Sequence, residues 1–248
     1  MKAFAIMLRH GLRQLLGWRR VAGLGLLMLV PVVVTLAVVG DLGDAAALRR
    51  FHEAPFATLM LVALPVVALI LGAAALGDER RDQTLSFLLV RPLKREAIVG
   101  AKLLSGWLAT VLLVGGGAAL SGLVMGLSAG RGDVLVPLLV AVAISTLGYA
   151  SIFVLLGYVT GRAVLYGLAY VFIWESGITG AVDALATVSL WRIGLSAYVD
   201  MVPESRPQLR DVLGNLTPGV WGAAAKVVVI ADLALAIGGL LLRHRDAT

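Results

Sequence analysis

Long apolar runs separated by short charged segments dominate this chain. Six runs have the ~20 residues that a helix needs to cross the hydrocarbon core of a membrane. They predict spans at about 21–39, 55–76, 103–128, 134–160, 163–182 and 220–242. The first four runs carry no charged residue, whereas the fifth contains Glu175 and the sixth contains Lys226 and Asp232. The pattern therefore predicts an all-α integral membrane protein in which residues 1–248 form one domain of six spans.

A basic amphipathic stretch precedes the first span. Its apolar residues recur at helical spacing and its cations lie largely off that stripe. The stripe holds Phe4, Leu8, Leu12, Leu15 and Leu16, and the cations are Lys2, Arg9, Arg13, Arg19 and Arg20. We interpret residues 1–20 as an interfacial helix on anionic lipid headgroups. The alternative is an ordinary basic flank of the first span.

Composition supports a membrane protein and excludes several kinds of site. Hydrophobic residues make up 60% of the chain and charged residues only 15%, against about 25% charged in soluble domains. The chain has no cysteine, which excludes disulfides and thiolate chemistry. No histidine–carboxylate cluster has metal-ligand spacing, so we predict no metal and no other cofactor. The basic residues flank the apolar runs and do not form one stripe, so nucleic acid is not an expected partner.

The distribution of basic residues predicts the orientation. With the amino terminus inside, fourteen lie in inner segments and six in outer segments. The inner ones are Lys2, Arg9, Arg13, Arg19, Arg20, Arg80, Arg81, Arg91, Lys94, Arg95, Lys102, Arg162, Arg243 and Arg245; the outer ones are Arg49, Arg50, Arg131, Arg192, Arg206 and Arg210. The positive-inside rule then predicts a multi-pass protein of the cell (inner) membrane with both termini in the cytoplasm.

The densest polar stretch, residues 78–102, lies between the second and third spans. Asp78 and Glu79 suit a helix amino terminus, and leucines recur at helical spacing after them. Arg91 precedes a proline, which disfavours helix at Arg91, and a second helix is expected from Lys94 into the third span. The pattern predicts a short cytoplasmic helix that docks on a partner, the alternative being a loop helix packed on its own bundle.

This stretch resembles the cytoplasmic loop of type-two (export) ABC transporter permeases. The matching positions are Glu79, Gln83-Thr84-Leu85, Leu88-Leu89, Pro92, Lys94-Arg95 and Lys102. Gln83 stands where the family has glycine, which puts a sharp turn there in question. The six-span layout and the amphipathic start are also similar to that family. The resemblance implies a coupling helix that contacts an ATP-binding subunit through Glu79, Arg80, Arg81, Thr84, Leu85, Leu88, Leu89 and Arg91.

The chain itself lacks a P-loop, which needs a lysine followed by serine or threonine. Its lysines are Lys2, Lys94, Lys102 and Lys226, and none has that neighbour. The chain is therefore not expected to be an enzyme, and ATP hydrolysis would require a separate ATPase subunit. By resemblance, a second copy or a paralogous permease would complete the translocation pathway within membrane lipid.

Three ionisable residues lie inside predicted spans, where charge is costly and often functional. Glu175 follows aromatic residues in a run similar to one in the family's fifth span, and is predicted to be a structural or gating carboxylate. Pairing with Lys226 requires the fifth and sixth spans to pack together. Alternatively, Glu175 faces water at the end of a shorter helix. Asp232 is interpreted as a gating group or a hydrogen-bonded contact within the bundle.

The remaining features are weaker. Residues 184–218 are half apolar and predict re-entrant or interfacial helices on the outer side, with Trp191 and Tyr198 at headgroup level. The glycine pairs Gly122/Gly126 and Gly157/Gly161 indicate close helix packing. Two other classes stay open: an intramembrane lipid-modifying enzyme, which would need a convergent polar cluster, and a non-transporting membrane anchor or assembly factor.

Overall fold

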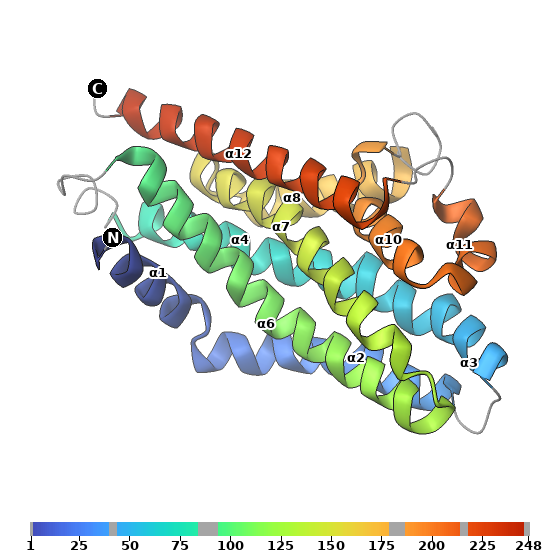
Figure 1. Ribbon diagram of the computed structural model, residues 1–248. Helices are drawn as coiled ribbons and strands as arrows, with labels where there is room; N and C mark the ends of the chain where they lie inside the picture. The colour runs from blue at the N-terminus through green and yellow to red at the C-terminus, as the bar shows by residue number, and fades with distance from the viewer. Residues whose placement is uncertain (1, 40–43, 84–93, 179–186, 214–217, 246–248) are drawn as a thin grey trace.

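A computed structural model describes residues 2–39, 44–83, 94–178, 187–213 and 218–245 of the chain. Within these ranges the protein is an all-helical bundle, and no strand occurs in them (Figure 1). The predicted all-α class is therefore confirmed.

Five helical segments among the described residues are long and apolar enough to cross a membrane. The first, third, fourth and last correspond to α2 (Trp18–Val39), α6 (Arg95–Ala129), η3 and α7 (Gly132–Val134, Leu135–Val159) and α12 (Gly219–Arg245). The second is a composite of α3 (Asp44–Phe51), the π-helical turns η1 (His52–Phe56) and η2 (Thr58–Ala63), and α4 (Leu64–Arg81). Because the helix continues through the π-turns around Pro55, this span starts before the predicted residue 55.

The predicted fifth span is not among the five. It consists of α8 (Ala163–Ala169) and η4 (Tyr170–Ile178), and only Ala163–Glu175 counts as a shorter apolar helix. The rest of that predicted span, residues 179–182, lies outside the described residues. The structure thus supports a multi-pass membrane protein with five candidate spanning helices among the described residues, and the predicted sixth span is not confirmed.

The bundle has two ends, each formed by short helices and by the ends of long ones (Figure 1). One end, here called the basic end, holds α1 (Lys2–Leu15), the end of α4, the start of α6 and the end of α12. An ion pair of 2.5 Å between Glu96 and Arg243 joins two of these elements. The opposite end holds α3, α10 (Leu190–Met201), η6 (Pro203–Ser205) and α11 (Arg206–Leu213).

Helix α1 is docked along α6. Met7 and Leu15 are buried, and a Cβ added to Gly11 would lie 2.7 Å from Ser105 Oγ. The glycine thus allows the two helices to approach closely, while Ile6 and Trp18 remain exposed. The predicted amphipathic helix therefore divides its surface between α6 and the surroundings of the protein, and its place in the membrane interface stays a prediction.

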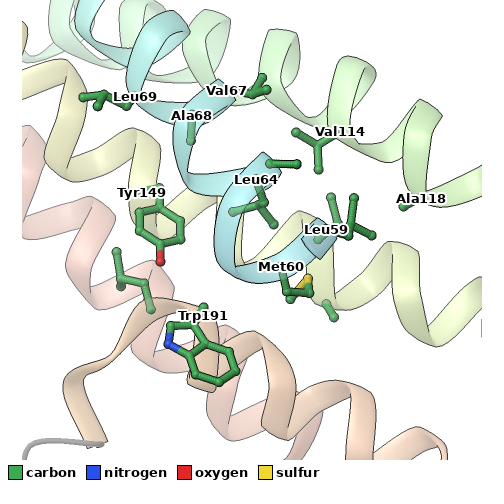
Figure 2. Packing of buried hydrophobic residues seen from close by; sticks show 14 of the residues in the cluster. Leu59, Met60, Leu64, Val67, Ala68, Leu69, Val114, Ala118, Tyr149 and Trp191 are labelled. Carbon is green, nitrogen blue, oxygen red and sulfur yellow. The ribbon is translucent and has the colours of Figure 1, made fainter. Parts of the chain in front are cut away.

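The buried core is centred on the η2–α4 segment (Figure 2). Leu59, Met60, Leu64, Val67 and Leu69 are at most 1% exposed. Residues of α6, α7 and α10 surround them, as Val114, Tyr149 and Trp191 show in Figure 2. Because lipid is as apolar as these side chains, close packing between helices holds such a bundle together more than water exclusion does.

Close packing is most evident between α4 and α7. A Cβ built on Gly157 would overlap the backbone carbonyl of Ala73, and one built on Gly77 would lie 3.1 Å from the Gly157 carbonyl oxygen. The two backbones are therefore in contact. The predicted small-residue contact at Gly157 is present, whereas a Cβ on Gly161 would meet nothing within 4 Å.

Gly157→Ala is expected to destabilise the bundle by about 1–3 kcal/mol, the usual range for overpacking, because backbone cannot move aside as a flexible side chain can. Unfolding by SDS titration in mixed micelles measures this change. Gly161→Ala is the matched control and should leave the midpoint unchanged. Equal midpoints for Gly157→Ala and the wild type would contradict the contact.

Candidate functional site

A buried ion pair joins the two helices that flank residues 84–93. Glu79, near the end of α4, pairs with Lys102 in the first turns of α6, and the two residues are 6% and 2% exposed. Asp78, one position earlier, accepts hydrogen bonds of 2.5 Å from both Arg20 at the start of α2 and Arg81. These residues, called the basic-end cluster below, fasten α2, α4 and α6 together immediately beside the predicted coupling helix.

The predicted coupling residues divide into two groups. Arg80 donates a 2.6 Å hydrogen bond to the carbonyl oxygen of Tyr158 at the end of α7, and Arg81 is largely exposed. The carboxylate of Glu79 lies inside the bundle, so it is placed to hold α6 and not to form an exposed contact. The remaining predicted residues, Thr84, Leu85, Leu88, Leu89 and Arg91, lie outside the described part of the chain.

Gln83, which stands where the family has glycine, has the backbone conformation of a sharp turn. The α4 helix ends at Arg81, and Gln83 has φ = +56°. Non-glycine residues seldom adopt this left-handed conformation, which is the one that a glycine after a helix usually supplies. The chain therefore makes the helix-ending turn without glycine.

Glu175 holds the start of α10. Its carboxylate accepts hydrogen bonds from the Leu190 backbone N–H (2.9 Å), the Ser189 hydroxyl (2.5 Å) and the Tyr170 hydroxyl (3.1 Å). The first N–H groups of a helix have no partner within the helix, and the helix dipole favours an anion there. Glu175, only 2% exposed, thus fastens the predicted fifth span to the outer segment.

Lys226 and Asp232 are both exposed on α12. The structure does not bring Lys226 to Glu175, because the Lys226 side chain points away from the bundle while Glu175 is buried against α10. Asp232 has no hydrogen bond among the described residues, so its role as a gating group or a bundle contact stays a prediction. The helical rotation of α12, which an apolar sequence does not reveal, decides both positions.

Helix α10 is buried inside the bundle. Trp191 is 6% and Tyr198 0% exposed, so both pack against protein, and their position at headgroup level stays a prediction. A Cβ on Gly194 would overlap Ser145 Oγ of α7, which shows how closely α10 approaches α7. The apolar residues of α10 are therefore part of the core.

A polar contact that the sequence did not indicate locks α10 and α11 to the second span. His52 Nε2 lies 3.0 Å from the Tyr198 hydroxyl, and His52 Nδ1 lies 2.8 Å from Gln208 Oε1. Burial raises the pKa of Tyr198 above its ordinary value, so its hydroxyl keeps the proton and donates to Nε2, while Nδ1–H donates to Gln208. Because the partners are 146 and 156 residues away, no local signal pointed to them.

A family model settles which class of membrane protein this is. The model described as ABC-2 family transporter protein matches residues 40–221, a stretch that includes the end of α4, the whole of α6 and α7, Glu175 and α10. The chain belongs to the ABC-2 transporter family. No curated protein and no solved structure matches the chain.

Membership of the ABC-2 family shows in which kind of protein the basic-end cluster is found. The chain is a membrane permease of an ABC transporter, a transport component and not itself a catalytic subunit. Among the described residues of this ABC-2 permease, no group of three or more His, Asp or Glu side chains is arranged to hold a metal ion. The described polar contacts of the basic-end cluster hold helices together.

Proposed function

We propose that this ABC-2 permease is the membrane subunit of an ATP-driven exporter and receives motion from a separate ATPase subunit through residues 79–91. The observation that carries the proposal is the Glu79–Lys102 pair, which joins the helices on both sides of that segment. A push on the segment would reach α4 and α6 together. Asp78 and Arg20 would extend the movement to α2.

The charge distribution and the arrangement of the bundle support one orientation. The basic end carries α1, the end of α12 and both flanks of the coupling segment, and most of the basic residues belong to its predicted side of the membrane. We place this end in the cytoplasm of a cell with an inner membrane. Two permease copies, or this chain and a paralogue, would enclose the pathway above two ATPase subunits.

The rival functions have less support. A lipid-modifying enzyme needs convergent reactive groups, whereas the buried carboxylate Glu175 is occupied by three donors from η4 and α10. A non-transporting anchor would not need an ion pair between the helices on the two sides of residues 84–93. ATP-driven coupling therefore accounts for more of the geometry.

Leu88→Asp is expected to reduce co-purification of a P-loop ATPase with the tagged full chain by about thirtyfold, the loss of ~2 kcal/mol that marks an interface hot spot. A charge in an apolar contact is not compensated, whereas Leu88→Met, the control, conserves volume and apolarity. The bound ATPase is identified by mass spectrometry and quantified against the permease. Unchanged recovery with Leu88→Asp would contradict the coupling assignment.

A further inference from the structure

A groove of about 800 Å³ opens on the side of the bundle at its basic end. Its walls come from the basic-end half of α4, the end of α7, the start of α8 and Arg20 of α2. Ile70 and Arg81 of α4, both in its lining, are eleven positions apart, about 16 Å at 1.5 Å per residue. That length matches one leaflet, half of the ~30 Å hydrocarbon core.

The floor of the groove is apolar and made of small residues. Ala73, Ala74, Gly77 and Gly157 lie where the α4 and α7 backbones touch, so no side chain fills the space above them. Val164 and Leu165 of α8 line one side and are 50% and 61% exposed. The volume lies within the roughly 300–1,000 Å³ of small-ligand sites.

The mouth of the groove is strongly basic. Arg20, Arg80, Arg81 and Arg162 line it together with a single lining carboxylate, Asp78. Asp78 already accepts from Arg20 and Arg81. In the described part of the chain, Arg20 Nη1 is buried without a hydrogen-bond partner, and the Arg162 side chain has no ion pair. Guanidinium groups with spare donors match phosphate and carboxylate oxygens.

We propose that this groove binds an anionic amphiphile from the inner leaflet, with the anionic headgroup between Arg20 and Arg162 and the apolar chain along Ala73, Ala74 and Val164. That this amphiphile is the substrate of the permease rests on the proposed function. Binding of the amphiphile to the groove does not depend on it. Small residues accept the chain by shape, and the arginines select the charge.

Cysteine labelling tests this assignment, since the chain has no cysteine of its own. The full chain carrying Val164→Cys is placed in phosphatidylcholine nanodiscs and treated with a maleimide, with dodecyl phosphate as the probe. Dodecyl phosphate is expected to slow labelling about tenfold. Inorganic phosphate, which lacks the chain, and dodecylphosphocholine, which lacks the net charge, should not slow it.

Two matched variants control for position and charge. Leu240 on α12 is 54% exposed and lies a few residues from Arg243, as Val164 lies a few residues from Arg162. The labelling of Leu240→Cys should not respond to dodecyl phosphate. Arg162→Gln added to Val164→Cys should abolish the protection. Arg19→Gln, which removes an exposed arginine outside the groove, should preserve it.

Several results would overturn the assignment. Recognition of an anionic headgroup would be contradicted by any of three results. These are equal protection by dodecylphosphocholine, equal protection at Leu240→Cys, and equal effects of Arg162→Gln and Arg19→Gln. Unreactive Val164→Cys before any probe is added, with cross-linking between two copies, would show instead that a second copy covers the groove.

The labelling uses neither nucleotide nor ATPase, so it fails separately from the proposed function. If dodecyl phosphate protects Val164→Cys while Leu88→Asp leaves ATPase recovery unchanged, the two results together would support the amphiphile site and contradict the proposed coupling. Lost ATPase recovery together with absent protection would reject the substrate class alone.

Discussion

Lys102→Met is expected to destabilise the folded chain by about 3–5 kcal/mol, the cost of breaking a buried pair by removing one partner. The substitution conserves length but removes the ammonium group beside Glu79, whose carboxylate is in the interior between α4 and α6. The expected result is a large shift of the SDS-unfolding midpoint.

Two further variants distinguish this effect from a general effect of charge. Lys94→Met removes an exposed lysine eight residues earlier and should change stability by less than about 0.5 kcal/mol. Glu79→Gln combined with Lys102→Met should recover most of the loss, since no buried charge remains. Lys102→Met as stable as the wild type would show that the pair does not hold the two helices together.

The second large effect is expected at Glu175. Glu175→Ala removes the acceptor of the Leu190 N–H, the Ser189 hydroxyl and the Tyr170 hydroxyl. A buried donor without a partner costs about 1–3 kcal/mol, so a total loss of at least ~2 kcal/mol is expected. The loss should be concentrated in α10, and hydrogen exchange of its first-turn amides should accelerate by about thirtyfold or more, the factor to which ~2 kcal/mol corresponds.

Two control variants test whether the effect is specific to the Glu175 carboxylate. Asp232→Asn changes a carboxylate on the exposed face of α12 and should leave α10 exchange unchanged. Ser189→Ala removes one of the three donors and should have a smaller effect than Glu175→Ala. Wild-type exchange at Leu190 in Glu175→Ala would mean that the carboxylate does not hold α10, and a purely gating role for Glu175 would then be favoured.

The sequence predicted the interruption between α4 and α6 but not what holds its two flanks. Charged residues and Pro92 are local signals, and they marked a segment between two spans. Glu79 and Lys102 are 23 residues apart, and only the packing of α4 on α6 brings them together. Hydropathy shows that Glu79 is charged but not that its side chain is buried beside Lys102.

The same limitation explains the charged residues of α12. Its length predicted a span, and the structure has α12 from Gly219 to Arg245. Lipid and protein core are both apolar, so sequence hydrophobicity does not distinguish the face that contacts α7 and α10 from the face that does not. The sequence therefore placed Lys226 and Asp232 within a predicted span but did not show which face of the helix carries them.

By itself the sequence determined that the chain is an all-helical membrane protein, where its long apolar helices lie, and that a basic, interrupted segment separates two of them. Those properties depend on composition and on spacing within about 20 residues. The tertiary structure decided that Glu175 caps α10, that Glu79 and Lys102 join α4 to α6, and that arginines from α2, α4 and the turn before α8 meet at one groove. Such contacts depend on the rotation and axial position of helices joined by loops, which no local pattern in an apolar chain records.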